Sequence, residues 1–494
     1  MKHSYIIGTD LGTGSTKTIA VDFSGNVLES SQKHYPTQSP HPGYSEQNPK
    51  EIFNAFVQSL KEIVSKMGCT PGAVSLSSAM HGLIAVDETC SPLTNLIIWS
   101  DSRSHIIANR IKKSAQGKSI YEATGTPIHS MSPFCKIVWL REQMPGIFGK
   151  THKFISIKEF IWYQLFKKFE IDYSIASATG LFNIENLCWN KTSLSVAQIT
   201  EQQLSEPVPT HYLRKYINEK TAALLGIPAA TPFCIGASDG CLANLGTNSL
   251  ESGTAAITIG TSGAVRVASS SPIKNYATMC FNYLLDENTF VCGGPVNNAG
   301  NAVQWLIKNF LLQNEANDQD YNALFQRIEM IPAGCDGLIF LPYINGERAP
   351  IWDEESCGVF LGIKSHHNQG HFLRAALEGI CFALKNVLST VESIDQPVIR
   401  INASGGFIQS PVWVQLLADI TGKPISIQQT EDASAIGAAW LCLKAMRAIP
   451  GYTSLSQKSG SVIYPKKQSE DVYEKNYMIF KTIYPALKNS MHFL

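Results

Sequence analysis

The first hundred residues combine short apolar runs with one segment of helical periodicity. Apolar-rich stretches at 4–7 and 17–23 flank a glycine-rich turn, and a second turn follows at 24–26. Short apolar runs joined by glycine turns predict antiparallel strands. Residues 49–67 instead repeat apolar side chains at a helical spacing. This repeat predicts an amphipathic helix whose buried face carries Ile52, Phe53, Phe56, Leu60 and Ile63.

Further along the chain, apolar stretches of different lengths predict both kinds of element. Residues 74–76 and 96–99 are short enough for strands, whereas 155–166 is an apolar segment of helical length. The last quarter of the chain predicts strand, helix, strand and helix in turn, at 399–402, 411–420, 423–428 and 433–446. The chain is therefore expected to have a mixed α/β fold.

The strand–turn–strand pattern at the start of the chain returns about half a chain later. Residues 255–264, Ala-Ala-Ile-Thr-Ile-Gly-Thr-Ser-Gly-Ala, resemble 5–12, Tyr-Ile-Ile-Gly-Thr-Asp-Leu-Gly, and a second apolar run follows each turn. A duplicated domain explains the repeat and would place a boundary near residue 245. A chance match between two short strand–turn–strand units explains it equally well at this point.

Length, charge and cysteine spacing argue against several classes of protein. A chain of 494 residues is too long for one hydrophobic core, so at least two domains are expected. Forty basic and forty acidic residues cancel, so no general attraction to nucleic acid or to an anionic membrane is expected. Twelve cysteines without a C-x-x-C pair argue against a disulfide framework or a zinc site. No secretion pattern and no apolar run of about 20 residues is found, which predicts a cytoplasmic protein.

The turn at 12–18, Gly-Thr-Gly-Ser-Thr-Lys-Thr, carries residue types that suit phosphate but matches neither common nucleotide motif. A P-loop requires glycine immediately before its lysine, where Thr16 stands, and Lys17 replaces the third glycine of a dinucleotide fingerprint. A β-turn-β loop remains, whose backbone and hydroxyl groups can approach phosphate oxygens. Asp10 at the end of the first strand could hold Mg²⁺ through its water ligands. A plain hairpin with a capping aspartate is the alternative.

Five segments together resemble the FGGY carbohydrate kinases of the actin-like ATPase superfamily. Asp10-x-Gly12-Thr13-x-Ser15-Thr16-Lys17 resembles the first phosphate loop, and Gly260-Thr261-Ser262-Gly263 resembles the second. Two longer signatures match at 131–143 and 358–378. The fifth segment is Leu341-Pro342-Tyr343 followed by Gly346-Glu347-Arg348-Ala349-Pro350. The resemblance extends over essentially the whole chain, and it explains the internal repeat as a domain duplication.

The resemblance implies two ribonuclease-H-like α/β domains flanking a deep cleft. Residues 1–245 would bind the sugar and carry the first phosphate loop, and 246–494 would carry the second phosphate loop and bind adenosine. The cofactors would be ATP and Mg²⁺, with Asp10 as the metal ligand. The residues assigned to the nucleotide are Gly12, Thr13, Gly14, Ser15, Thr16, Lys17, Gly260, Thr261, Ser262, Gly405, Gly406 and Gly437. Close packing of a helix against a sheet explains the Gly437 region equally well.

Phosphoryl transfer to a hydroxyl also requires a group that accepts the hydroxyl proton. Gly236-Ala237-Ser238-Asp239-Gly240 matches the family segment that carries this base, which makes Asp239 the catalytic candidate. Local sequence alone favours a different role for Asp239, as the N-cap of the helix-like segment at 242–245.

The acceptor pocket is expected in the first domain. Met80-His81 resembles the Met-His pair that faces the sugar in xylulose kinases, and Met131 lies in the substrate-contacting stretch of the family. The candidate substrate contacts are Met80, His81, His129, Met131 and Asp239. Asp101 and Arg103 are expected close by. The donors available to an acidic acceptor are His81, His129, Lys158 and Arg103.

Two segments, at 125–133 and 172–184, look most like the gluconate kinase version of the family. The expected activity is therefore ATP-dependent phosphorylation of a sugar acid, gluconate to 6-phosphogluconate. Ser130 departs from the pattern, because gluconate kinases tend to have proline there. A xylulose or other pentulose kinase is the alternative within the family, and a non-kinase actin-like ATPase is the remote one. The expected partner is a small-molecule sugar or sugar acid, with no nucleic acid and no membrane, and a homodimer is left open.

Overall fold

The computed structural model describes residues 5–311, 327–394, 397–428, 432–455 and 460–494. The chain forms two compact units, and neither is continuous in sequence. Unit 1 contains Met1–Leu250, Ser269–Cys292 and Asp432–Gln457, and unit 2 contains Glu251–Ala268, Gly293–Glu431 and Lys458–Leu494. The domain boundary near residue 245, and the roles assigned to the two domains, stay predictions.

Unit 1 is built on a six-stranded sheet in the order β13-β14-β5-β1-β2-β3. Its strands are β1 (Ile6–Leu11), β2 (Ser15–Val21), β3 (Val27–His34), β5 (Val74–Ser78), β13 (Leu213–Arg214) and β14 (Phe233–Ser238). The strands predicted near 4–7, 17–23 and 74–76 are confirmed, with bounds shifted by a few residues. β1, β5 and β14 run parallel, whereas β2 and β3 are antiparallel to their neighbours. The three parallel strands therefore end at one edge, where ligands bind in open α/β sheets.

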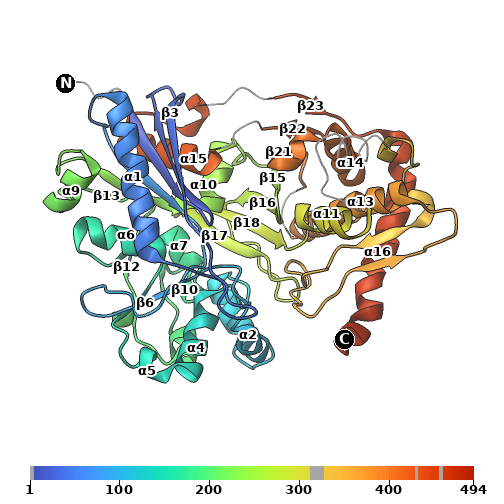
Figure 1. Cartoon of the computed structure of the whole chain (residues 1–494), viewed down its shortest axis with the longest axis horizontal. Helices are drawn as coiled ribbons and strands as arrows, with labels where there is room; N and C mark the ends of the chain where they lie inside the picture. The colour runs from blue at the N-terminus through green and yellow to red at the C-terminus, as the bar shows by residue number, and fades with distance from the viewer. Residues whose placement is uncertain (1–4, 312–326, 395–396, 429–431, 456–459) are drawn as a thin grey trace. The chain divides into compact units, whose positions relative to one another are not determined.

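Helices cover both faces of this sheet (Figure 1), namely α1 (Pro49–Met67), α6 (Ile157–Phe166), α10 (Asp239–Gly246) and α15 (Ala433–Ala445). Successive side chains of a strand point to opposite faces. Ile7 accordingly packs into one core with Phe56 of α1 and Ile161 of α6. Ile6 packs into another core with Leu242 of α10 and the apolar residues of α15. The predicted helices at 49–67, 155–166 and 433–446 are thus the outer layers of an α/β/α unit.

The ends of α1 follow from its flanking residues. The side chain of Asn48 accepts a hydrogen bond from the backbone N–H of Lys50 at 3.0 Å, and Pro49 occupies the first helical position, where no N–H is required. Gly68 ends the helix in the left-handed region, with φ of 65°, and its N–H donates to the Val64 carbonyl.

The remaining elements of unit 1 surround this sheet. Its further strands are β4 (Glu46–Gln47), β6 (Ile84–Val86), β7 (Leu96–Ile97), β8 (Lys153–Ile155), β9 (Glu170–Asp172), β10 (Phe182–Asn183), β11 (Cys188–Trp189), β12 (Glu206–Val208) and β17 (Phe281–Asp286). Its further helices are α2 (His105–Lys112), α3 (Gly117–Thr124), α4 (Pro133–Gln143), α5 (Pro145–Phe148), α7 (Tyr173–Ser177), α8 (Lys191–Ala197) and α9 (Glu219–Leu225).

Unit 2 repeats the arrangement of strands at the start of unit 1. β15 (Thr254–Ile259) is antiparallel to β16 (Gly263–Ser269) and parallel to β21 (Arg400–Ser404), as β1 is antiparallel to β2 and parallel to β5. The resemblance between 5–12 and 255–264 therefore extends to strand pairing, which a chance match of short segments does not explain.

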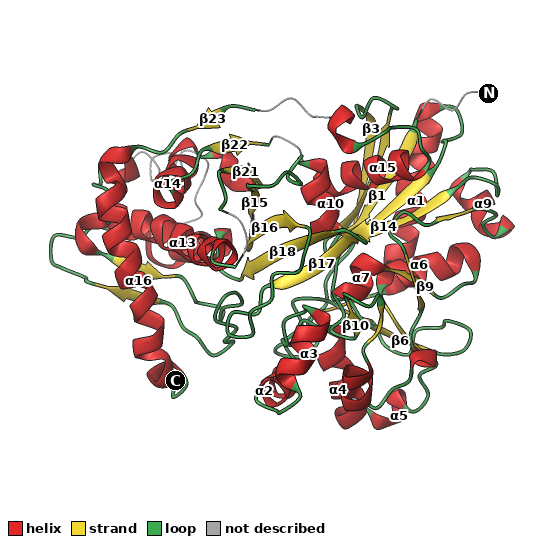
Figure 2. Cartoon of the chain, turned by 180° about the vertical axis from the view of Figure 1, so that it is seen from behind, coloured by secondary structure: helices red, strands yellow, loops and turns green. Residues whose placement is uncertain are grey.

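The other elements of unit 2 complete its layers (Figure 2). They are β18 (Thr289–Val296, whose first residues belong to unit 1), β19 (Ile339–Leu341), β20 (Val359–Leu361), β22 (Ile425–Ile427), β23 (Val462–Ile463), α11 (Gly300–Leu306), α13 (Gln369–Glu392), α14 (Pro411–Thr421) and α16 (Glu470–Met491). The strands and helix predicted at 399–402, 411–420 and 423–428 correspond to β21, α14 and β22 and are confirmed.

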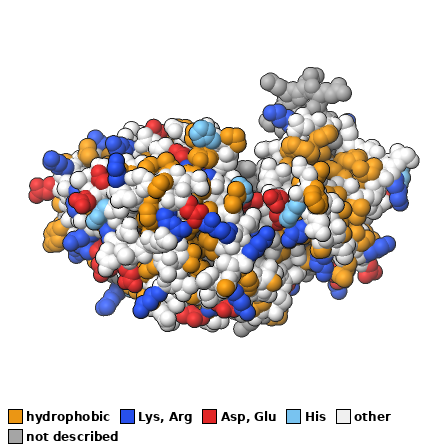
Figure 3. Space-filling view, turned by 90° about the horizontal axis from the view of Figure 1, so that it is seen from below, with side chains coloured by type: hydrophobic (Ala, Val, Ile, Leu, Met, Phe, Trp, Pro, Cys, Tyr) orange, Lys and Arg blue, Asp and Glu red, His pale blue; other side chains and the backbone are white. Residues whose placement is uncertain are grey.

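The surface carries charges of both signs. On the face shown in Figure 3, the basic and acidic side chains drawn in colour are interspersed. None of the helices in the described ranges has both the length and the apolar composition that crossing a membrane requires.

Candidate active site

Two carboxylates that are far apart in sequence meet at the carboxyl edge of the unit 1 sheet. Asp10 near the end of β1 lies opposite Ser77 on β5, and Ser77 lies opposite Ala237 on β14. Asp10 Oδ1 accepts a hydrogen bond from Ser77 Oγ at 2.6 Å. Asp239 follows Ala237 by two residues and is the first residue of α10. The topology therefore brings Asp10 and Asp239 to one edge, as a site for a cation and a proton acceptor requires.

The charge of Asp239 affects the protonation of Asp10. Burial and the neighbouring charge of Asp239 raise the pKa of Asp10 to about 7, while the Ser77 hydrogen bond and the charge of Lys17 act in the opposite direction. Carboxylate oxygens are the ligands that Mg²⁺ prefers, and a divalent cation would relieve the repulsion between the two groups. The residues at this edge therefore fit the metal assignment of Asp10, which stays a prediction.

We expect Asp10→Asn to stabilise the metal-free protein at pH 8 but not at pH 5. In the folded state, a carboxyl with a pKa raised to about 7 retains a proton that the unfolded chain has already released. Its contribution to stability therefore falls as the pH rises from about 4 to about 7, and asparagine removes this loss. In EDTA, the melting temperature should rise by about 2–4 °C at pH 8, since the group is partly exposed and water screens its charge. An equal or lower melting temperature for the variant at pH 8 would contradict the raised pKa.

Asp239 is not the N-cap that local sequence favours. Ser238 has the extended backbone of an N-cap, and its hydroxyl accepts from the Cys241 N–H at 3.4 Å. Asp239 is partly exposed at the next position, and its Oδ1 accepts from the Gly240 N–H at 2.7 Å. Because a neighbouring serine does the capping, the carboxylate of Asp239 is left in a position compatible with the chemical role that the sequence predicts.

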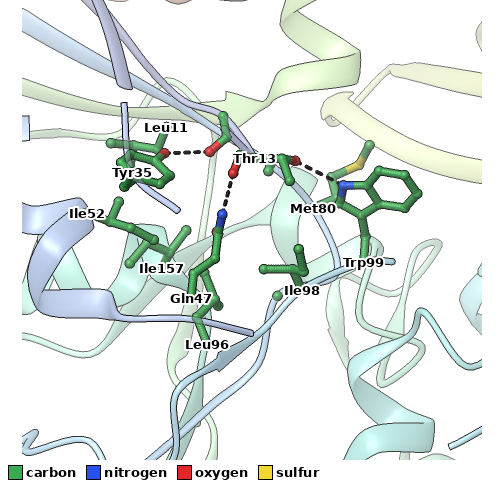
Figure 4. Close-up of a pocket in the computed structure, with 13 residues that line it drawn as sticks. Leu11, Thr13, Tyr35, Gln47, Ile52, Met80, Leu96, Ile98, Trp99 and Ile157 are labelled. Atoms are coloured by element: carbon green, nitrogen blue, oxygen red, sulfur yellow. Dashed lines mark hydrogen bonds between the residues drawn. The ribbon is translucent and has the colours of Figure 1, made fainter. Parts of the chain in front are cut away.

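Three side chains form hydrogen bonds to Gly12 and Thr13, in the loop predicted to bind phosphate (Figure 4). Tyr35 donates to the Gly12 carbonyl at 2.5 Å, Gln47 donates to the Thr13 carbonyl, and the Trp99 indole N–H donates to Thr13 Oγ1 at 2.9 Å. The void between these side chains measures only about 10 Å³, which is too small for a ligand. These contacts therefore fix the loop and satisfy the carbonyl groups of Gly12 and Thr13.

The loop has open space at Gly14 but is crowded at Gly12. A side chain at Gly14 would meet no atom within 4 Å, whereas one at Gly12 would lie 3.2 Å from the Ser15 carbonyl and 3.4 Å from the Asp10 carboxylate. Lys17 Nζ forms an ion pair with Asp432 at 2.8 Å, at the start of α15. Ser15 begins β2, and the buried Thr16 follows it inside the strand.

A Trp99→Phe variant tests whether the hydrogen bond from the Trp99 indole to Thr13 supports ATP binding. We expect Trp99→Phe to raise the KM for ATP about 3–10-fold, the effect of one lost hydrogen bond, and to change the KM for the sugar much less. Trp189→Phe is the matched control, since the Trp189 indole donates to the Ser205 carbonyl at 3.1 Å in another part of unit 1. Steady-state kinetics with each substrate varied in turn would decide. Equal effects of the two variants on the KM for ATP would rule out this role.

His81 is held rigidly beside Met80. Its backbone is in the left-handed region, with φ of 66°, and the buried Lys136 ammonium donates to its carbonyl at 2.6 Å. The ring Nδ1 donates to the Ala178 carbonyl at 2.8 Å, so Nε2 of the neutral ring accepts from the Tyr283 hydroxyl at 3.0 Å. Met80 lines the small void beside Trp99 (Figure 4). Substrate contact by Met80 and His81 stays a prediction, and the fixed ring of His81 suits a precise contact.

His129 and Met131 lie in the turn that precedes α4. His129 Nδ1 accepts from the Met131 N–H at 3.2 Å, which places the proton of the neutral ring on Nε2. The His129 carbonyl accepts from the N–H of Ser132, the N-cap of α4, at 3.0 Å. Met131 is fully buried and His129 is 8% exposed. The turn therefore fixes the orientation of the His129 ring, and substrate contact by His129 and Met131 stays a prediction.

Two of the four donors proposed for an acidic substrate already bind carboxylates. Arg103 donates to Asp101 at 2.7 Å and to Glu46 at 2.6 Å, and all three side chains are largely buried. Lys158 Nζ donates to Asp172 Oδ2 at 2.6 Å and to the Ala237 carbonyl at 2.8 Å. The expectation that Arg103 and Lys158 are available to a substrate is therefore wrong. Asp101 is only two residues from Arg103, but nothing in the sequence indicated that Glu46 or Asp172 would be partners, because both lie in other elements.

Three of the five predicted nucleotide residues of unit 2 line one cavity of about 640 Å³, a size that fits a nucleotide. Gly260, Thr261 and Gly406 line it, together with Phe407 and Trp413. Gly405 lies against the strand before the loop, with φ of 100°, where a β-carbon would meet the Ile259 carbonyl at 2.3 Å. Ser262 continues the loop that begins at Gly260, and the Gly260 N–H donates to its carbonyl at 2.9 Å.

Gly437 has a packing explanation of its own. A β-carbon at this position would lie 2.0 Å from the Leu242 carbonyl, because α15 packs closely on α10 within unit 1. A β-carbon at Gly246, in the same contact between the two helices, would lie 2.1 Å from the Ala433 carbonyl. Helix-to-helix packing thus accounts for Gly437, where the sequence suggested packing against a sheet, and its assignment to adenosine stays a prediction.

Sequence reasoning missed several residues that hold the loops. Gly300 at the start of α11 donates its N–H to the Gly260 carbonyl at 2.9 Å, and Asn301 donates to the Thr261 carbonyl at 3.1 Å. The run Asn297-Asn298-Ala299-Gly300-Asn301 before a helix could have signalled this contact. Tyr35 and Gln47 gave no comparable signal, because each is a single polar residue whose partner is a backbone carbonyl.

Comparison with known proteins extends the resemblance to the whole chain. Residues 5–246 match the N-terminal domain of the FGGY family of carbohydrate kinases, and residues 255–446 match its C-terminal domain. A gluconokinase from Bacillus licheniformis is 40% identical, over 98% of this chain and 96% of the relative.

Two solved structures share the fold. The crystal structure of gluconate kinase from Lactobacillus acidophilus has a TM-score of 0.93 at 33% identity and covers 98% of both chains. The structure of ligand-bound xylulose kinase from the same organism has a TM-score of 0.94 at 33% identity and covers 99% of both. The expected two-domain α/β fold is confirmed. With both family domains matched and relatives aligned over nearly its full length, the chain belongs to the FGGY family of carbohydrate kinases.

Proposed function

We propose that this carbohydrate kinase phosphorylates gluconate with ATP to give 6-phosphogluconate. The main support is that the chain is 40% identical to a gluconokinase but 30% identical to a xylulose kinase from Staphylococcus epidermidis, each over nearly its full length. The segments at 125–133 and 172–184 favour the same substrate. Fold similarity does not discriminate, since the two solved structures are equally close.

The proposed chemistry uses the two carboxylates at the sheet edge. Asp239 accepts the proton of the acceptor hydroxyl. The oxygen of that hydroxyl forms a bond to the γ-phosphorus of ATP, and the bond between this phosphorus and the ADP leaving group breaks. Asp10 would hold Mg²⁺, which, when bound, neutralises charge on the phosphate oxygens. Residues 12–17 and the loops at 260–262 and 405–406 would position the nucleotide through backbone N–H and hydroxyl groups, with Gly437 as a further candidate. A cytoplasmic location is part of the proposal as well, whereas the oligomeric state is left open.

An acidic acceptor needs a hydrogen-bond donor, because a buried carboxylate without one is very costly. Arg103 and Lys158 have their own carboxylate partners, which leaves the histidines as candidates. The segment at 125–133, which looks most like the gluconate kinase version of the family, contains His129. We therefore propose that His129 recognises the gluconate carboxylate, with Met80, His81 and Met131 shaping the rest of the acceptor site.

A comparison of substrates tests the proposal directly. We expect kcat/KM for gluconate to exceed the values for xylulose and ribulose at least tenfold on one enzyme preparation, since a charge-assisted hydrogen bond contributes about 1.5–3 kcal/mol. A tenfold preference for xylulose would instead establish the second candidate, a pentulose kinase. The observation that favours this second candidate is the Met80-His81 pair, which pentulose kinases share. ATP hydrolysis that no added sugar or polyol stimulates would point to a non-kinase ATPase.

A further inference from the structure

One short segment of unit 1, residues 172–179, contacts three parts of the proposed acceptor site. The Ala178 carbonyl accepts from His81 Nδ1 at 2.8 Å. The Ser177 carbonyl accepts from Thr126 Oγ1 at 2.6 Å, and the Thr179 carbonyl accepts from the Phe134 N–H at 2.9 Å. Ser174 contacts the third part of the site, the segment that carries Asp239.

Ser174 forms two hydrogen bonds with Ser238, the residue immediately before Asp239. Its Oγ accepts from the Ser238 N–H at 3.1 Å and donates to Ser238 Oγ at 2.8 Å. Ser238 Oγ in turn accepts from the Cys241 N–H and so caps α10. Both serines are fully buried, so water does not compete for these bonds. One hydroxyl therefore fixes the backbone and the cap oxygen that orient the first residue of α10.

The segment is itself anchored. Asp172 caps α7 by accepting the Ile175 N–H at 3.0 Å through Oδ1, and its Oδ2 receives the Lys158 ammonium. Lys158 also donates to the carbonyl of Ala237, which precedes Ser238. The ion pair and the two serines therefore connect α7 and the end of β14 at consecutive residues, 237 and 238.

We propose that Ser174 is a positioning residue for phosphoryl transfer, which holds the Asp239 carboxylate in line with the acceptor hydroxyl. The proposal rests on the function proposed above for Asp239. A misplacement of about 1 Å can cost up to 10²-fold in rate. Loss of the Ser174 hydroxyl removes both bonds to Ser238 but leaves the carboxylate itself and the phosphate loop of unit 1 in place. It should therefore act on the chemical step rather than on binding.

The first measurement separates kcat from KM. We expect Ser174→Ala to lower kcat roughly tenfold, with the KM for ATP and for gluconate changed less than about twofold. Ser193→Ala is the matched control. Ser193 is also a buried serine in the first turn of a helix, and its hydroxyl donates to the capping Asn190 at 3.0 Å, in α8. Its kcat should match that of the parent. A kcat for Ser174→Ala equal to that of the control, with only the melting temperature lowered, overturns the proposal.

The second measurement is a double-mutant cycle with Asp239→Asn. If Ser174 acts through Asp239, removing its hydroxyl should change the residual kcat of Asp239→Asn less than twofold. A further tenfold loss in the double variant would show an independent effect and overturn the proposal. Parent-like activity of Asp239→Asn alone would refute the proposed base instead, so the two failures are distinguishable. Should Ser174→Ala not fold, Ser174→Cys enters the same cycle. This variant leaves no cavity and replaces the hydroxyl with a slightly larger, weaker thiol donor, and a parent-like kcat would again overturn the proposal.

Discussion

Asp239→Asn is expected to lower kcat by roughly 10²–10⁴-fold, the usual contribution of a general base. Asparagine keeps the shape of the side chain and its hydrogen bond from the Gly240 N–H, but it cannot accept the proton of the acceptor hydroxyl. Because Ser238 rather than Asp239 caps α10, the substitution leaves the helix end intact. The KM values for ATP and the sugar should therefore change little, and a coupled assay of ADP release would measure the loss.

Because Asp239→Asn also removes a negative charge, the loss of charge alone needs a control. Asp22→Asn provides it, since Asp22 is a carboxylate of unit 1 that accepts hydrogen bonds within an exposed turn. This variant should retain the kcat of the parent. If Asp239→Asn also turned over within a fewfold of the parent, another group would have to accept the proton. The raised pKa of Asp10 would then make Asp10 the first residue to test.

Most of the fold could be predicted because local patterns and tertiary structure agree in this chain. The apolar face of 49–67 predicted α1, and glycine turns between apolar runs predicted β1 with β2 and β15 with β16. The position of Asp10 at a strand end followed from the same pattern. What local patterns do not contain is strand order, so the closeness of Asp10 to Asp239 emerges only from the parallel order of β1, β5 and β14.

The partners of charged side chains were harder to predict. Arg103 and Lys158 both suggested substrate contact from sequence, since a lone cation in an acceptor domain suits an acidic ligand. Glu46 and Asp172, which bind them, lie in different elements and carry no local signal. Ser174 was part of a segment chosen for its family likeness, yet its bond to Ser238 spans 64 residues and could not be read from that likeness.

Lys158→Met is expected to lower the free energy of unfolding of unit 1 by about 3–5 kcal/mol, because it leaves the Asp172 carboxylate buried without its cation. Both side chains of the pair are at most 2% exposed, so water cannot replace the ammonium. Lys66→Met is the matched control. Lys66 pairs with Glu62 on the surface at 3.0 Å, where water and salt screen the charges, so breaking this pair should change the stability little. Urea denaturation followed by intrinsic fluorescence would compare the two midpoints.

The pH dependence of this loss identifies its cause. Burial raises the pKa of Asp172 even with Lys158 present, and removal of the ammonium must raise this pKa further. The folded variant then keeps a proton that the unfolded chain releases, so its stability falls as the pH rises, and the deficit should be larger at pH 8 than at pH 6. Adding Asp172→Asn should restore most of the stability at pH 8, since asparagine is neutral and its oxygen can still accept the Ile175 N–H. A deficit that is the same at both pH values and persists in the double variant would assign the loss to packing of the lysine stem instead of the buried charge.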